Sequence, residues 1–238
     1  MIKLIDKLPD IKNKNAAYAK ICCHFAAYKE FSNIALFWAQ FDNENNPCAL
    51  FSMIDSVMML CYDGGDIDEI TEFLRAVGPK KIFTDAKTAS KLNLNIEVSC
   101  ATLYRDPPFL DENAIENTYT GIDALYNTLS KGLNIGNREA FIADISHRIR
   151  HNAATYVSSP FSAAAIIFDE KFAVINGIAV LPEKSGLGLG SATLNRLLSG
   201  MKNRRVFVCA EQKNIPFYLK NGFAFYEDAA YTNTNGVF

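Results

Sequence analysis

A glycine-rich loop between an apolar strand and an amphipathic helix is the feature that most constrains this sequence. Residues 172–181 (FAVINGIAVL) are almost continuously apolar, which is typical of a strand covered on both faces. The segment that follows at 185–191 (SGLGLGS) has glycine at alternate positions. From Leu189 onward, apolar residues recur at three- and four-residue steps. The pattern therefore predicts a strand, a glycine turn and a helix in succession.

The start of such a helix favours an anionic ligand. Its first amide N–H groups have no partner within the helix, and the helix dipole adds about half a positive charge there. Glycines at 186, 188 and 190 remove side chains that would keep a bulky phosphate away from these amides. The spacing fits neither the G-x-G-x-x-G dinucleotide fingerprint nor a Walker loop, which needs Gly-Lys-Ser/Thr. A glycine turn that binds no ligand is the alternative interpretation.

A second motif occurs at residues 217–223 (FYLKNGF), a short amphipathic helix whose terminal glycine leads into an aromatic strand. Together with Pro182-Glu183 and Gly188-x-Gly190, this segment resembles the GNAT acyltransferases, whose motif A follows a Pro-Glu pair and whose motif B reads Leu/Phe-Tyr-x-Lys-x-Gly-Phe. The resemblance covers residues from about 112 to 238. It implies a mixed, mostly antiparallel sheet flanked by helices, and acyl transfer from acyl-coenzyme A.

The resemblance also assigns roles to individual residues. In GNAT enzymes the loop amides hold the pyrophosphate of acetyl-coenzyme A, the preceding strand pairs with the pantetheine arm, and a motif B tyrosine protonates the departing thiolate. That tyrosine is matched by Tyr218, a phenol whose ordinary pKa of about 10 keeps it protonated at neutral pH. A core tyrosine without a chemical role is the alternative. The positions matched to cofactor binding are Ile178, Ala179, Val180, Ser185, Gly186, Leu187, Gly188, Leu189, Gly190, Ser191 and Asn214.

Three departures from the family pattern leave two functions open. Ser185 stands where the family usually has Arg or Gln, Glu211 stands where it often has Asn, and residues 172–181 contain no acid that would serve as a general base. The first function is an N-acetyltransferase that moves an acetyl or other short acyl group from coenzyme A to an amine of a small molecule. The alternative is a non-catalytic module that binds acyl-coenzyme A or a partner protein.

Composition adds few constraints. The chain has 238 residues, a net charge of −2 and 49% hydrophobic residues, which describes a globular protein without the basic excess of a nucleic-acid binder. We expect a cytoplasmic protein, because the N-terminal residues lack the apolar core of a signal peptide and no apolar run is long enough to span a membrane.

Six cysteines without C-x-x-C spacing predict neither disulfides nor a zinc site. Asp144, His147 and His151 share one helix face, but the neighbouring arginines favour a solvated charged face over a metal site. Composition does not indicate an oligomeric state.

Two prolines at 107 and 108 mark the predicted domain boundary. We expect an accessory α/β domain at 1–106 and a GNAT domain at 107–238. Both halves are expected to run helix, three strands, helix, strand, so the first is interpreted as a degenerate GNAT-like copy without the glycine loop. The expected helices cover 16–31, 67–77, 86–92, 122–131, 137–151, 189 onward and 215–221, and the expected strands cover 34–41, 47–54, 57–61, 81–84, 97–103, 153–157, 162–168, 172–181, 206–209, 223–226 and 229–232.

Overall fold

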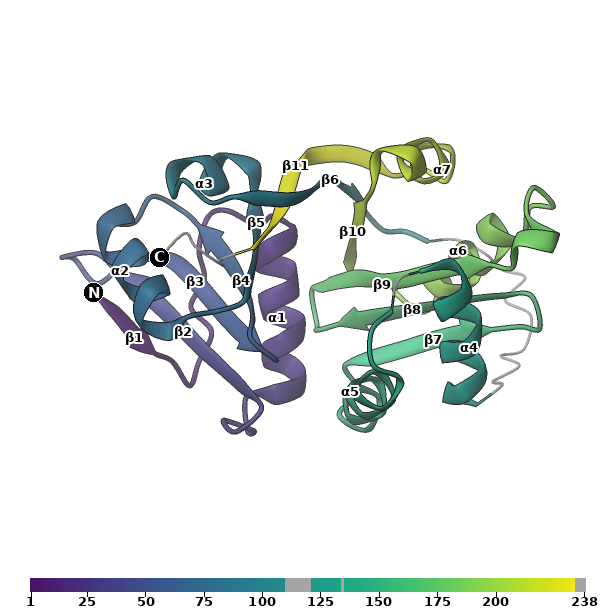
Figure 1. The fold of residues 1–238 in the computed structure, drawn as a ribbon, viewed down its shortest axis with the longest axis horizontal. Helices are drawn as coiled ribbons and strands as arrows, with labels where there is room; N and C mark the ends of the chain where they lie inside the picture. Colours follow the sequence, from purple (N-terminus) through teal and green to yellow (C-terminus); the bar gives the residue numbers. More distant parts are fainter. Residues whose placement is uncertain (110–120, 134, 234–238) are drawn as a thin grey trace. The chain divides into compact units, whose positions relative to one another are not determined.

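The computed structural model describes residues 1–109, 121–133 and 135–233. The polypeptide divides into two compact units, one formed by residues 1–104 and 209–238 and the other by residues 105–208 (Figure 1). Each unit is a mostly antiparallel sheet with helices on its faces, which confirms the predicted fold class.

The sheet of the first unit has the strand order β1-β2-β3-β4-β5-β11-β6. Strand β11, from the end of the chain, pairs antiparallel with both β5 and β6. The strands are β1 (Ile2–Leu4), β2 (Ala35–Phe41), β3 (Pro47–Ile54), β4 (Val57–Tyr62), β5 (Lys81–Asp85), β6 (Ile96–Arg105) and β11 (Ala224–Asn233), and the helices are α1 (Ala16–Tyr28), α2 (Ile67–Val77), α3 (Ala86–Lys91), the 3-10 turn η2 (Gln212–Asn214) and α7 (Ile215–Lys220).

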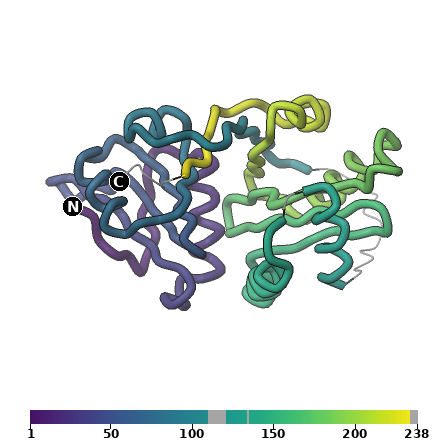
Figure 2. Tube along the Cα trace, viewed as in Figure 1, coloured from purple at the N-terminus to yellow at the C-terminus, as the bar shows by residue number. Residues whose placement is uncertain are grey.

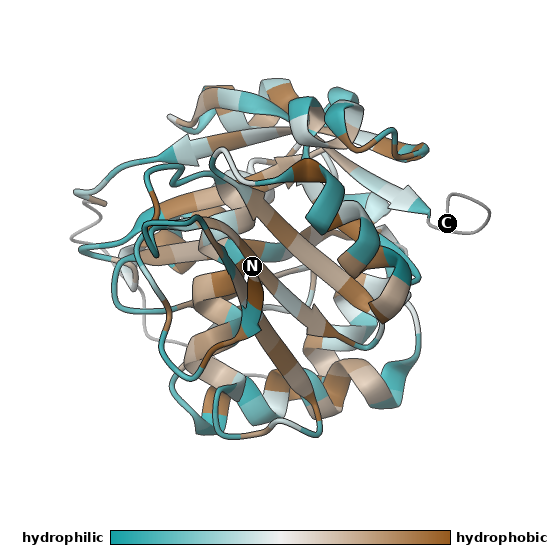
Figure 3. Ribbon diagram, turned by 90° about the vertical axis from the view of Figure 1, so that its left-hand side faces the viewer, coloured by the Kyte–Doolittle hydropathy of each residue, from teal (hydrophilic) through white to brown (hydrophobic). Residues whose placement is uncertain are grey.

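The core of the first unit follows the two-residue period of its strands. Phe37 of β2 packs edge-on against Phe25 of α1, with ring centroids 5.0 Å apart. Its neighbour Trp38 faces Phe73 of α2 at 5.3 Å, and Phe51 of β3 approaches the same ring at 5.1 Å. Helices α1 and α2 therefore cover opposite faces of the sheet. Figure 3 shows the result: the strands in the middle of the view are mostly hydrophobic, whereas the helices alternate between hydrophobic and hydrophilic stretches.

The sheet of the second unit has the order β10-β9-β8-β7. Helix α4 lies so close to β9 that a Cβ added at Gly132 would lie 2.8 Å from the Cβ of Ala179. Helix α6 is fixed to β8 by a 2.7 Å hydrogen bond between the buried hydroxyls of Ser162 and Thr193. The elements are α4 (Ile122–Gly132), α5 (Arg138–Arg150), β7 (Ala154–Ser158), β8 (Ser162–Phe168), β9 (Phe172–Val180), η1 (Pro182–Lys184), α6 (Leu189–Ser199) and β10 (Arg205–Ala210).

The order of elements repeats along the chain, as the colour ramp of Figure 2 lets the reader follow. The first run is α1-β2-β3-β4-α2-β5-α3-β6 and the second is α5-β7-β8-β9-α6-β10-α7-β11. In each run an antiparallel meander ends in a parallel pair, β4 with β5 over 57–59 and 81–83, and β9 with β10 over 172–174 and 205–207. The two halves therefore share a topology, as expected for a repeat.

Two expected elements are corrected. The strands predicted at 223–226 and 229–232 form one strand, β11. A register shift between Phe225 and Glu227 allows the ladder between β11 and β6 to continue through the predicted break. Strand β1 was not predicted. The domain boundary at residue 106 stays a prediction. The compact units follow spatial contacts, and the first unit includes residues from both ends of the chain.

Candidate functional site

The predicted glycine loop connects β9 to α6 as a turn of left-handed residues. Both Gly186 and Gly188 have φ of +79°. Gly188 is the N-cap residue of α6. In this described segment no side chain caps the helix, and the first turn contains no acidic residue. The first helical hydrogen bond runs from the Ala192 N–H to the Gly188 carbonyl, at 3.1 Å. The amides of the preceding helical residues are therefore available to an anion.

The glycine loop is open to solvent and is not closely packed. Residues 185–188 are exposed, and a Cβ built at Gly186 or Gly188 would meet no atom of the described residues within 4 Å. The glycines are thus needed for their positive φ, which costs other L-residues about 1 kcal/mol or more, and not for tight packing. Gly186, Leu187, Gly188, Leu189, Gly190 and Ser191 lie together in this turn and first helical residues, with Ser185 at its start.

The strand before the loop, β9, is paired along only part of one edge. Its ladder with β10 covers only Phe172–Val174, whereas Ile178, Ala179 and Val180 pair with β8 on the other edge. The β8–β9 register shifts at Asn176, an exposed residue that bulges out of the ladder. The residues predicted to contact pantetheine therefore lie beyond the β9–β10 ladder, in an arrangement suited to pairing with an extended ligand.

Tyr218 lies in α7, within the first unit, and its side chain is buried at 6% exposure. Its ring packs edge-on against Phe217 and Phe223, with centroids 5.0 and 5.5 Å away. The helix ends as predicted in a glycine: Gly222 has φ of +79°, its N–H bonds to Leu219 O, and Phe223 N–H bonds back to Tyr218 O. Burial, and secondarily the charge of Cys209, raises the pKa of Tyr218, so the phenol carries its proton at neutral pH.

Asn214 and Glu211 lie at the turn before α7. Asn214 is the last residue of η2 and the N-cap residue of α7, which it does not cap through its side chain in the described structure. Glu211 forms a 2.8 Å ion pair with Lys213, and both side chains are more than half exposed. The geometry therefore places Glu211 in a surface pair.

The charged side chains near Asp144, His147 and His151 are not all exposed to solvent as predicted. Arg148 is buried at 4% exposure, and its Nε donates to both Asp144 carboxylate oxygens, at 2.8 and 2.9 Å. The two histidine rings stack with centroids 4.4 Å apart. Over residues 1–109, 121–133 and 135–233, no group of three acidic, histidine or cysteine side chains is arranged to hold a metal ion.

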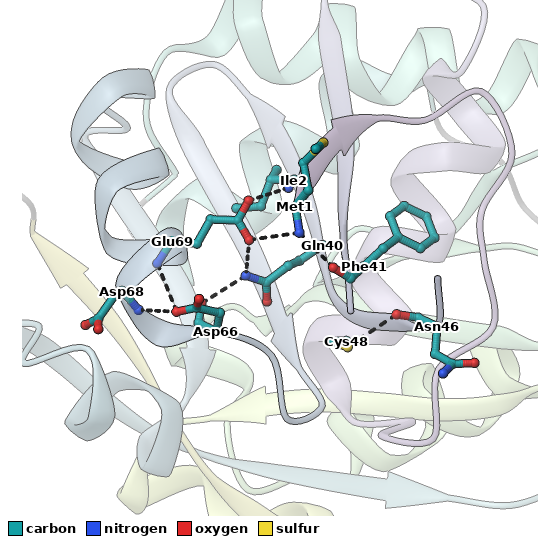
Figure 4. A network of polar contacts seen from close by, with 9 residues as sticks. All are labelled: Met1, Ile2, Gln40, Phe41, Asn46, Cys48, Asp66, Asp68 and Glu69. Carbon is teal, nitrogen blue, oxygen red and sulfur yellow. Dashed lines mark hydrogen bonds and ion pairs between the residues drawn. The ribbon is translucent and has the colours of Figure 1, made fainter. Parts of the chain in front are cut away.

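The equivalent helix start in the first half carries its own anion (Figure 4). Asp66 Oδ1 accepts from the N–H groups of Asp68 and Glu69 at the start of α2, at 2.9 and 3.2 Å. The Glu69 carboxylate accepts from the Ile2 N–H and from Gln40 Nε2, both at 2.7 Å. The Asp66 carboxylate thus occupies amides at the start of α2, whereas the start of α6 has no side-chain cap.

An antiparallel meander that ends in a parallel pair, followed by a glycine turn without a side-chain cap and a helix, is the arrangement of the second half of the chain. Residues 150–223 match the model of the Acetyltransferase (GNAT) family, which identifies a GNAT domain in this stretch of the chain. The matched range includes the glycine loop and Tyr218.

Solved structures similar to the chain share this fold over nearly its whole length. An acetyltransferase of the GNAT family from Colwellia psychrerythraea is 12% identical, with 98% of this chain and 99% of that chain covered and a TM-score of 0.52. A GCN5-related N-acetyltransferase from Sphaerobacter thermophilus is 12% identical over 90% of both chains, with a TM-score of 0.57. A tandem GNAT protein from the clavulanic acid biosynthesis pathway is 10% identical over 97% of both chains, with a TM-score of 0.51.

No protein of curated function matches the sequence. Among the described helices, none has the length and apolar character needed to cross a lipid bilayer.

Proposed function

We propose that this protein is an N-acyltransferase that moves an acetyl or other short acyl group from coenzyme A to an amine of a small molecule. The observation that carries the proposal is the contrast between the two helix starts: α6 begins with open amides at Gly188, whereas α2 begins under the Asp66 carboxylate. The same contrast supports the interpretation of the first half as a degenerate copy that does not bind coenzyme A.

In the proposed reaction the amine nitrogen forms a bond to the thioester carbonyl carbon, and the bond from that carbon to sulfur breaks. The proton that the amine nitrogen loses passes to solvent, the coenzyme A thiolate takes a proton from the Tyr218 hydroxyl, and the Tyr218 oxygen regains a proton from solvent. Residues 185–191 are proposed to bind the pyrophosphate, Ile178 to Val180 to align the pantetheine arm, and Asn214 to be a further contact of the cofactor. Positioning supplies most of the rate, since the thioester is already an activated acyl donor.

The first experiment combines titration calorimetry with acetyl-coenzyme A and a thiol-release assay against a panel of small amines. Binding together with amine-dependent thiol release supports the acyltransferase. Binding without release on any amine supports the non-catalytic module instead, and the absence of binding contradicts both functions.

The role of Tyr218 is tested by Tyr218→Phe, which removes the hydroxyl and keeps the packed ring. We expect kcat to fall about 100-fold, within the range typical of a lost general acid, with little change in the Kd for acetyl-coenzyme A. Tyr62→Phe is the matched control, because it removes a hydroxyl that donates to Gly65 O in the first half. An unchanged kcat in folded Tyr218→Phe would dismiss the proposed acid.

A further inference from the structure

The glycine loop of the second unit is held at both ends by one short segment of the chain. This segment covers residues 159–162, from the end of β7 to the first residue of β8. Before the loop, the Leu181 N–H donates to the Phe161 carbonyl oxygen, at 2.8 Å. After the loop begins α6, and the buried hydroxyl of its Thr193 lies 2.7 Å from that of Ser162. The chain before the loop and the helix after it are therefore both attached to residues 159–162.

Hydrogen bonds within residues 159–162 give this segment a defined shape. The Ser159 hydroxyl oxygen accepts from the N–H groups of Phe161 and Ser162, at 3.3 and 3.1 Å. The same hydroxyl lies 3.0 Å from the Ser162 hydroxyl, which extends the contact with Thr193 into a chain of three hydroxyls. Both backbone groups of Phe161 are thus hydrogen-bonded, although the residue is 42% exposed. The segment therefore holds an accessible aromatic ring in a defined place.

A lysine ammonium lies over this ring, immediately before the glycine loop. The Lys184 Nζ is 5.0 Å from the centroid of the Phe161 ring, a distance typical of cation–π contacts. The backbone of this lysine is fixed as well, because its N–H donates to the Leu181 carbonyl oxygen, at 2.9 Å. Lys184 is half-buried, whereas residues 185–188 are exposed. The segment at 159–162 therefore holds a positive charge next to the loop in addition to supporting the loop itself.

The charge of Lys184 is not neutralised within the part of the chain that the structure describes. No carboxylate of residues 1–109, 121–133 or 135–233 forms an ion pair with this lysine. Several other cations of the second unit do have carboxylate partners: Arg138 pairs with Asp123, Arg148 with Asp144 and Arg205 with Asp106. The ammonium of Lys184 therefore adds a full positive charge to the partial charge at the start of α6, which favours an anionic ligand.

We propose that Lys184, positioned by the Phe161 ring, pairs with the diphosphate of acyl-coenzyme A and supplies the charge that Ser185 lacks. Position 185 is where GNAT enzymes usually carry Arg or Gln, so in this chain the charged side chain lies one residue earlier. The inference rests on the proposed function, because it requires coenzyme A to bind at the glycine loop. The amides of the loop then orient the phosphate oxygens, and the ammonium neutralises part of their charge.

The contribution of the charge is tested by Lys184→Met, which removes the ammonium and keeps an unbranched side chain. In titration calorimetry we expect the Kd for acetyl-coenzyme A to rise about tenfold, as for a lost charge-assisted hydrogen bond. Lys184→Arg should retain the affinity, and Lys171→Met, at an exposed lysine of the turn between β8 and β9, should leave it unchanged. Unaltered affinity in Lys184→Met would overturn this inference alone, whereas an unmodified chain that does not bind acetyl-coenzyme A would overturn the proposed function with it.

Salt and a truncated ligand identify the interaction that is lost. Raising NaCl from about 0.1 M to about 1 M shortens the Debye length from about 10 Å to about 3 Å, so the Kd should rise more in the unmodified chain than in Lys184→Met. Dephospho-coenzyme A lacks the 3′-phosphate but keeps the diphosphate, so Lys184→Met should weaken its binding by the same factor as that of coenzyme A. Equal salt dependence of the two chains, or a loss confined to coenzyme A, would contradict the assignment to the diphosphate.

The positioning role of Phe161 is tested by a double-mutant cycle. Phe161→Leu removes the ring beneath the ammonium and should raise the Kd for acetyl-coenzyme A about threefold, which is within the range of a cation–π contact at an exposed site. Phe161→Tyr keeps an aromatic ring and should restore the affinity. In the Lys184→Met background, Phe161→Leu should have no further effect, because the ring then has no charge to hold. Additive losses in the double variant would overturn the positioning role. None of these measurements depends on turnover.

Discussion

At the scale of single residues, Glu227 shows how this fold shifts a carboxyl group away from its ordinary behaviour. It lies on β11 in a partly buried position, where burial and then the Asp85 carboxylate raise its pKa from 4.5 to about 7. The Asn15 side chain opposes the shift without cancelling it. The folded protein therefore binds a proton at Glu227 more tightly than the unfolded chain does.

The sign of the resulting pH dependence follows from linkage. Between pH 4.5 and about 7 the folded state retains a proton that the unfolded state has lost, so the free energy of unfolding decreases as pH rises through this window. Glu227→Gln should remove that decrease and stabilise the protein at pH 8 by on the order of 1 kcal/mol, after allowance for solvent screening of a partly exposed group. Urea unfolding at pH 5 and pH 8 measures the difference.

Glu72→Gln is the matched control for Glu227→Gln, because it makes the same change at an exposed position of α2. It should leave the difference in unfolding free energy between pH 5 and pH 8 as it is in the unmodified chain. A Glu227→Gln variant with the same pH dependence as the unmodified chain would show that Glu227 titrates normally.

At the scale of elements, the starts of α6 and α2 differ: α6 has no side-chain cap, whereas the Asp66 carboxylate caps α2. Substitutions at two glycines test whether this difference matters for binding. Gly188→Ala should destabilise the fold by about 1 kcal/mol through its positive φ, and should raise the Kd for acetyl-coenzyme A about tenfold, because the strained turn displaces the amides. Calorimetry measures the affinity and thermal unfolding the stability.

Gly78→Ala provides the control, since Gly78 also has a positive φ, +64°, and a Cβ there would meet no described atom within 4 Å. It ends α2 in the first half, so it should cost similar stability and leave the affinity unchanged. Equal losses of affinity in both variants would argue against a role of the loop in binding.

A second pair of glycines tests the packing of α4 on β9. Gly132→Ala places a Cβ 2.8 Å from the Cβ of Ala179, so we expect a loss of about 1–3 kcal/mol despite the better helix propensity of alanine. Gly200→Ala has the opposite expectation: the residue has helical φ of −76°, its closest described neighbour would lie at 3.7 Å, and a gain of up to about 1 kcal/mol should follow. Urea denaturation of both variants distinguishes the signs.

Local chemistry explains why most elements were predictable. Asp66 and Gly78 bound α2 as expected, and Gly222 ends α7 as expected, because caps are encoded within a few residues. Strand β1 has only three residues, which is too short for a periodic signal. The pairing of β11 between β5 and β6 depends on residues distant in sequence and could not be predicted from local patterns.

At the scale of the whole molecule, the last strand of the chain completes the sheet of the first unit. Residues Ala229–Asn233 pair with Lys81–Asp85 of β5, and the other edge of β11 pairs with β6 from Tyr104 to Ile96. Tyr231 also packs against Phe83, with ring centroids 4.8 Å apart. The predicted domain at 1–106 therefore lacks a strand that the first unit contains.

A chain ending at residue 208 should consequently lose order in a defined part of the fold. Without β11, strands β5 and β6 have no partner on the edges that it occupies, so their amides should exchange hydrogen with solvent faster than in the full chain. The amides shared by β7, β8 and β9 should keep their protection, because their ladders do not involve β11. A chain ending at residue 233 retains β11 and serves as the control, and hydrogen exchange read by mass spectrometry compares the three chains. Unchanged protection of β5 and β6 in the shorter chain would show that residues 1–106 complete their own sheet. Loss of protection confined to those two strands would show that the fold of the first half of the chain depends on the C-terminal strand.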